Sequence, residues 1–121
     1  MMRWLSVTAC IALGSGCATA PPVPAQRFTD AETDIKAAQD LGADNSPQGK
    51  VHLQQARDQL AEAKRLSKDE PGVAARKLDN AQAEAELAKS LTREQATRAE
   101  ADQAKARLSA VQNNLGTGGA Q

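Results

Sequence analysis

The same apolar pattern occurs twice in this chain, in residues 53–66 and again in residues 78–91. Leucine and alanine recur in both runs at steps of three and four residues, which places them along one face of a helix. The turn-forming sequence of residues 69–72, Asp-Glu-Pro-Gly, separates the two runs. Helices joined by so short a break pack most simply as an antiparallel hairpin. The chain is therefore predicted to be all-α, with Leu53, Leu60 and Leu78 in the seam between the two helices.

The composition favours an elongated helical protein over a compact enzyme. Alanine supplies most of the apolar residues, and Phe28 is the only aromatic residue downstream of Trp4. Alanine favours helix strongly but buries little surface. Lysine and arginine together number 15, and so do aspartate and glutamate. No large net charge therefore draws the protein toward nucleic acid or anionic lipid.

Local signals predict a short helix ahead of the hairpin. Thr29 and Glu32 have the spacing of a capping box, in which each side chain satisfies a free backbone donor of the other residue. Gly42 can end this helix in the left-handed conformation. Ser46 followed by Pro47 predicts the start of the next helix, because proline at the first helical position loses no needed donor.

The third helix is predicted to be much longer than the other two. It starts near Pro71, and no proline or glycine interrupts residues 73–115. The predicted fold is thus an antiparallel hairpin with a short preceding helix and a long, coiled-coil-like C-terminal helix. This helical domain is predicted to span residues 28–115, followed by a disordered tail at residues 116–121.

The first 16 residues have the pattern of a secretory signal peptide. Arg3 supplies a positive start, residues 4–13 are uncharged and mostly apolar, and small residues lead to Cys17. This order resembles a bacterial lipoprotein signal, which implies that Cys17 becomes the lipidated N-terminus. Gly14 departs from the leucine usual at its position, and Cys10 fits the local pattern slightly better. Cys10 would leave only about six apolar residues, below the usual length, so Cys17 is the predicted attachment site. The alternative is that both cysteines are ordinary leader residues.

Residues 17–27 are predicted to form a tether. Three prolines in this short polar stretch favour extended polyproline II over helix. Such a spacer would hold the helical domain about 30 Å from a membrane. By resemblance to lipoprotein sorting rules, Ala18 in place of aspartate indicates the outer membrane, with the helical domain facing the periplasm.

No group of residues in the sequence points to catalysis or to a cofactor. His52 is the only histidine, and a metal site needs several converging ligands. The glycines of the tail follow a helix, whereas a phosphate-binding loop precedes one. Several carboxylates alternate with lysine and arginine, which indicates a solvated face without the desolvating pocket that a general acid needs: Asp79, Glu84, Glu86, Glu94, Glu100 and Asp102. The protein is predicted not to be an enzyme.

The second half of the third helix carries the candidate interaction face. Its apolar residues continue at three- and four-residue steps after the hairpin partner ends: Ala101, Ala104, Leu108, Val111 and Leu115. A helix this long is marginal in water unless such a face is covered. The short first helix can reach only part of it, so self-association or a partner helix is predicted. The alternative is a frayed, solvated extension.

Residues 28–91 resemble an alanine-rich family of unknown function from envelope lipoproteins of Gram-negative bacteria, sometimes found ahead of an OmpA-like module. The similarity rests on these segments in addition to the hairpin pattern: residues 30–31, 37–38, 41–43, 46–47 and 81–88. The resemblance implies an all-helical periplasmic module without catalytic residues. We therefore expect a membrane-anchored structural or protein-interaction lipoprotein; the alternative is a small regulator or adaptor of an envelope enzyme or transporter.

Overall fold

The computed structural model describes residues 20–117. These residues form three α-helices, α1 (Ala25–Asp40), α2 (Pro47–Leu66) and α3 (Pro71–Thr117), with a short 3-10 helix, η1 (Ala43–Asn45), between α1 and α2. No strand occurs among them, and the predicted all-α class is confirmed. The predicted signal peptide, the lipidated Cys17 and the last residues of the tail lie outside the described residues.

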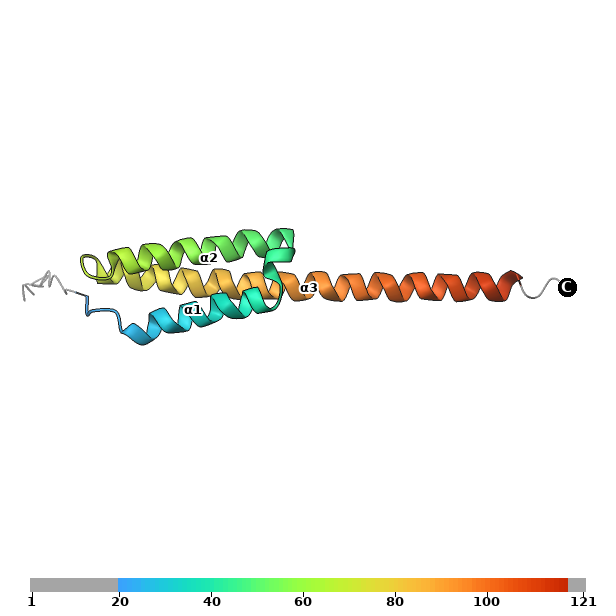
Figure 1. Ribbon diagram of the computed structural model, residues 1–121, viewed down its shortest axis with the longest axis horizontal. Coiled ribbons are helices and arrows are strands. Elements are labelled where there is room, and N and C mark those ends of the chain that lie inside the picture. Colours follow the sequence, from blue (N-terminus) through green and yellow to red (C-terminus); the bar gives the residue numbers. More distant parts are fainter. Residues whose placement is uncertain (1–19, 118–121) are drawn as a thin grey trace, which may run out of the picture.

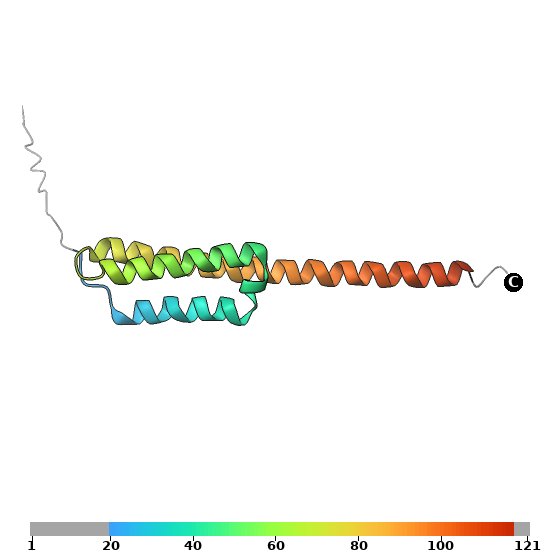
Figure 2. The same cartoon turned by 45° about the horizontal axis from the view of Figure 1, so that its top comes forward.

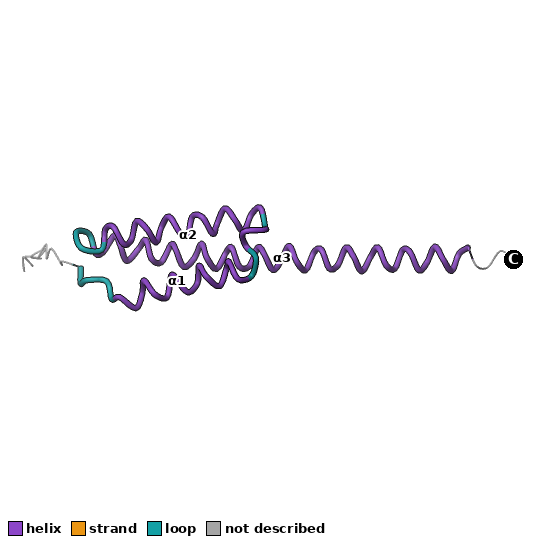
Figure 3. The backbone as a smooth tube through the Cα atoms, viewed as in Figure 1, coloured by secondary structure: helices purple, strands orange, loops and turns teal. Residues whose placement is uncertain are grey.

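The helices form a three-helix bundle from which α3 projects. α2 and α3 pack along each other in opposite directions, as the repeated apolar pattern predicts. α1 packs against both helices and runs in the same direction as α3 (Figures 1 and 2). It lies beside the first half of α3, so the expectation that it reaches part of the second half is wrong. That second half extends alone beyond the bundle (Figure 3).

The core of the bundle consists of leucine, isoleucine and many alanines. Leu53 of α2 and Leu78 of α3 are the largest side chains that are fully buried, and Leu60 is also buried, so the predicted seam is confirmed. Seven alanines of the three long helices are completely buried in the same cluster: Ala31, Ala38, Ala56, Ala63, Ala81, Ala85 and Ala88. Small side chains allow two packed helices to approach to an interaxial distance of about 8 Å, the low end of the usual 8–10 Å.

Two predicted helix boundaries around η1 are confirmed. Gly42 follows the last turn of α1 with a φ of 86°, the left-handed conformation that glycine adopts without steric cost. The Oγ of Ser46 accepts a hydrogen bond from the backbone N–H of Gly49 at 3.2 Å, with Pro47 at the first helical position. Gly42 and Ser46 thus mark the two ends of the chain reversal after which α2 returns along α1.

The predicted capping box is wrong. α1 begins at Ala25, with Pro24 in an extended conformation before it, so Thr29 lies within the helix. Three residues assigned to the tether are therefore helical. Packing explains the extra turn: Val23 and Phe28 lie against the core cluster, and Arg27 forms an ion pair with Asp79 of α3. Tertiary contact here outweighs a local capping signal.

α3 ends later than predicted. Gly116 and Thr117 belong to the helix, so the first two residues of the predicted disordered tail are helical. A glycine costs a helix only about 1 kcal/mol relative to alanine, which is too little to end it by itself.

Gly49 of α2 is buried, with little space around its Cα atom. A Cβ atom added here would lie 2.6 Å from Oγ1 of Thr92 and 3.0 Å from the carbonyl oxygen of Ala43. We expect Gly49→Ala to lower the free energy of unfolding although alanine favours helix by about 1 kcal/mol, because overpacking costs about 1–3 kcal/mol. Urea denaturation followed by circular dichroism measures this loss.

Gly116→Ala is the matched control for Gly49→Ala, because a Cβ atom there would meet no atom within 4 Å. We expect this control to leave the unfolding transition of the bundle unchanged. Adding Thr92→Ala to Gly49→Ala removes the nearest clashing atom and should recover part of the lost stability. A stabilising effect of Gly49→Ala alone would contradict the close approach of α2 and α3.

Candidate interaction surface

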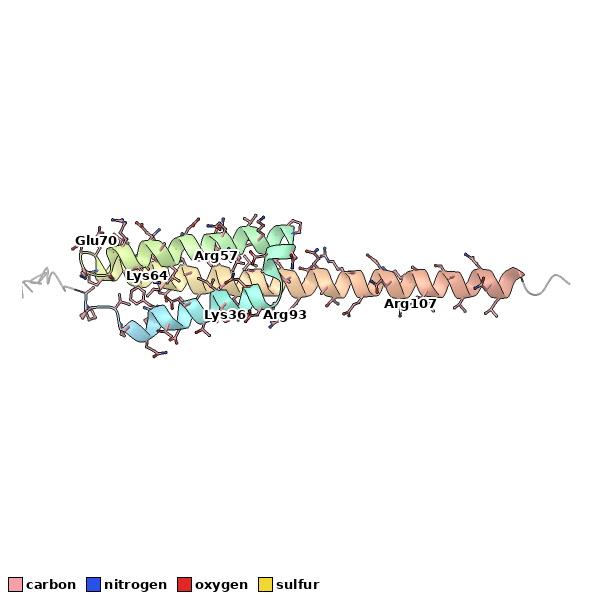
Figure 4. All side chains as sticks on the ribbon, viewed as in Figure 1. Lys36, Arg57, Lys64, Glu70, Arg93 and Arg107 are labelled. Carbon is pink, nitrogen blue, oxygen red and sulfur yellow. The ribbon has the colours of Figure 1, made fainter. Side chains whose placement is uncertain are left out.

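Apart from a hydrogen bond between Ser46 and Gln95 near its start, the second half of α3 extends away from the other helices. Every residue from 93 to 116, which we call the projection, is exposed. Figure 4 labels Arg93 at its start, beside the end of the bundle, and Arg107 further along it. The three largest apolar side chains of the projection are 64% (Leu108), 55% (Val111) and 74% (Leu115) exposed.

The five residues of the predicted interaction face all lie on the projection and form one row along it, which we call the apolar stripe: Ala101, Ala104, Leu108, Val111 and Leu115. Their spacing alternates between three and four residues, so their side chains share one helix face. The structure thus brings these five residues together on one surface. No described residue of α1 or α2 covers them.

The apolar stripe does not continue the buried seam of α3. An α-helix has 3.6 residues per turn, so residues about 18 positions apart lie on the same face. Counted back in this way, the stripe corresponds to five residues of α3 that are all exposed: Ala83, Glu86, Ser90, Arg93 and Thr97. Counted forward, the buried Ala81 and Ala88 correspond to Ala99 and Ala106. The stripe therefore points away from the seam, which corrects the interpretation of a single continuing pattern.

Charged residues surround the stripe on the projection. Arg98 forms an ion pair with Glu94 one turn earlier, and Lys105 lies 3.5 Å from Asp102. Within the part of the chain that the structure describes, Glu100 and Arg107 form no ion pair. Exposed pairs of this kind stabilise a helix by only about 0.2–0.5 kcal/mol each. They therefore add little to the stability of the projection, and they do not cover its apolar side.

A small open notch lies where α3 leaves the bundle. It has a volume of about 210 Å³ and is lined by Gly42, Asn45, Ser46, Thr92, Gln95, Ala96 and Ala99. The Oγ of Ser46 donates a hydrogen bond to Oε1 of Gln95 at 2.7 Å, which fixes the start of α2 to α3. The lining contains no acidic or basic side chain, and its polar side chains are the hydroxyls of Ser46 and Thr92 and the amides of Asn45 and Gln95. Gln95 was not singled out from the sequence, because its partner lies 49 positions away.

Interhelical ion pairs hold α1 in the bundle. The side chain of Lys89 is only 12% exposed; its Nζ lies 3.5 Å from a carboxylate oxygen of Asp34 on α1 and contacts Glu86 on its own helix. The hydrogen bond with Glu86 raises the pKa of Lys89 and lowers the pKa of Glu86. Lys64 of α2 reaches Glu32 of α1 at 2.6 Å. These pairs add to the apolar packing of α1 through Ala31, Ile35 and Ala38.

The remaining predicted candidates lie apart from the projection or are solvated. Nδ1 of His52 lies 2.7 Å from Oε2 of Glu84 across the α2–α3 seam. Glu84 is therefore half-buried and paired, and its assignment to a solvated face is wrong. The other five carboxylates of that set are exposed as expected: Asp79, Glu86, Glu94, Glu100 and Asp102. Sequence spacing could not reveal the His52–Glu84 pair, whose members come from different helices.

Residues 20–117 contain no cluster of three or more histidine, cysteine, aspartate or glutamate side chains able to hold a metal ion. None of the described helices is both long enough and apolar enough to cross a membrane.

Comparison with known proteins adds no assignment. No family model, curated protein or solved structure matches the chain. The resemblance to the alanine-rich lipoprotein family therefore stays a prediction.

Proposed function

We propose that this protein is a lipid-anchored lipoprotein of the cell envelope, in the outer membrane facing the periplasm, that contacts another protein through its projection and carries out no catalysis. The observation that carries the proposal is the apolar stripe. Leu108, Val111 and Leu115 are more than half exposed on a helix whose residues 93–116 are all exposed. Contiguous exposed apolar residues of this kind mark protein interaction sites.

The position of the chain's N-terminal side supports an anchored arrangement. Ala20 lies against Gly72 in the first turn of α3, next to the α2–α3 connection: a Cβ atom on Gly72 would be 3.3 Å from the Cβ of Ala20. This turn is the end of the bundle opposite the projection (Figure 1). A lipid on Cys17 would therefore hold the bundle near the membrane and direct the projection away from it. The projection has a length of about 36 Å.

Photocrosslinking in intact cells tests the contact. We expect a diazirine-bearing leucine analogue at position 108 to give a covalent adduct with a protein. The same analogue in place of Ala106, on the opposite side of the projection, should give none. Adducts at neither position, or equal adducts at both, would contradict a contact through the stripe.

Fatty-acid labelling of the same cells tests the anchor. Labelled palmitate should enter the wild type and Cys10→Ser but not Cys17→Ser. Equal labelling of Cys17→Ser would exclude Cys17 as the attachment site. The two readouts are independent, so the anchor and the contact can fail separately.

A further inference from the structure

We propose that the occupant of the apolar stripe is a second copy of this chain, and that residues 100–115 of the two copies form a parallel two-stranded coiled coil. This inference rests on the proposed function and names the partner of the same surface. The stripe has the spacing of core positions in a coiled coil, alternately three and four residues apart.

Packing favours the parallel orientation. In a parallel pair each core residue faces its own counterpart, so Leu108, Val111 and Leu115 give three consecutive layers of large side chains. In an antiparallel pair centred near Ala106, Leu115 would face Thr97 and Leu108 would face Ala104. The parallel arrangement therefore removes more apolar surface from water for the same residues.

The charges beside the stripe favour the same orientation. In a parallel coiled coil, a residue flanking the core lies near the residue five positions later on the partner. Glu100 then meets the partner's Lys105, and the symmetry makes two such pairs. Lys105 is free to do so, because its side chain is 77% exposed and its contact with Asp102 is long, at 3.5 Å. The antiparallel pair centred near Ala106 would instead oppose Lys105 to Lys105 and Arg107 to Arg107.

The contact between a flanking residue and the partner residue five positions later also limits where the pairing begins. Arg93 would lie near the partner's Arg98, which is a like-charged contact, and the outward face of the bundle beyond it carries Glu86 and Ser90. Pairing is therefore confined to the part of the projection after Arg98. Because the stripe points away from the seam of the bundle, a second helix can lie along it without meeting α1 or α2.

Anchoring makes so short a contact sufficient. Residues 100–115 span only about two heptads, and three large core layers give a weak dimer between freely diffusing chains. Two chains attached to one membrane surface are held at a high effective concentration. A parallel pair places both anchored ends on the same side, whereas an antiparallel pair would separate them by the length of both bundles.

Single-cysteine cross-linking in intact cells tests the pairing and its direction. Ala101→Cys and Val111→Cys are each introduced into the full chain carrying Cys10→Ser, and cells are treated with a membrane-permeant bismaleimide of about 8 Å span. In a parallel pair both variants should link to themselves as covalent dimers. Ala106→Cys, on the opposite side of the projection, should give no more dimer than the chain without an added cysteine. In the antiparallel pair, residue 101 lies about 15 Å along the axis from its own counterpart, so only a mixture of the two variants would link.

A charge exchange tests the proposed ion pairs. Glu100→Lys and Lys105→Glu should each lower the yield of covalent dimer about fivefold, because each converts two attractive pairs into repulsive ones. The double variant should restore the yield, since it re-forms both pairs with reversed signs. A helix weakened by the substitutions would not recover in this way.

The outcomes separate this inference from the proposed function. Covalent dimers of the stripe variants support it even if palmitate labelling fails. Palmitate labelling together with photo-adducts to a different protein, and no dimers, would overturn the inference and leave the proposed function standing. Linking only in the mixed sample would overturn the parallel orientation, and linking of Ala106→Cys to the same extent would overturn the stripe as the contact.

Discussion

Leu78→Ala is expected to lower the free energy of unfolding by about 2–5 kcal/mol, the range for a leucine removed from a packed core. Leu78 is completely buried in the seam between α3 and the other two helices. Most of the residues buried in the same core cluster are alanines, whose short side chains cannot move into the space that leucine leaves. The cavity should therefore persist, and the cost should lie in the upper part of the range.

Urea denaturation at several protein concentrations measures this loss, since the concentration series separates folding from any self-association. Leu87→Ala is the matched control: it removes the same atoms from the same helix, but Leu87 is 40% exposed. We expect Leu87→Ala to cost less than about 1 kcal/mol. Similar losses for the two variants would mean that the seam does not run along Leu78.

Ala85→Leu is expected to destabilise the bundle by about 1–3 kcal/mol although it adds an apolar side chain. Ala85 is fully buried in the core cluster, to which all three long helices contribute. A leucine there must push the helices apart or adopt a strained rotamer. Adding apolar bulk should therefore weaken this protein at the seam.

Ala83→Leu supplies the comparison, because Ala83 lies on the exposed side of α3 only two positions away. Leucine and alanine have similar helix propensities, so we expect this control to change stability by less than about 0.5 kcal/mol. Thermal unfolding of both variants, monitored by circular dichroism, distinguishes the two cases. Stabilisation by Ala85→Leu would show that the seam is loosely packed and that the helices do not need alanine at this position to pack closely.

Periodicity and turn chemistry alone determined most of the fold. The repeated leucine and alanine pattern predicted the α2–α3 hairpin, and Gly42, Ser46 and Pro47 predicted the reversal between α1 and α2, because these effects act within a few residues. The unbroken sequence after Pro71 predicted that α3 outruns its partners. The residues of the candidate interaction face were also predicted from the sequence.

Only the tertiary structure decided which faces of the helices are covered. Packing against α3 extended α1 back to Ala25, and it placed α1 beside the half of α3 that α2 already covers. The contact of the mostly buried Lys89 with Asp34 and the His52–Glu84 pair each join residues of two helices that are far apart in the sequence. The sequence showed an apolar pattern that seemed continuous along α3. In the structure the stripe and the seam lie on different faces of α3, because the apolar positions shift along the sequence between them. The stripe is exposed because α1 and α2 end before it.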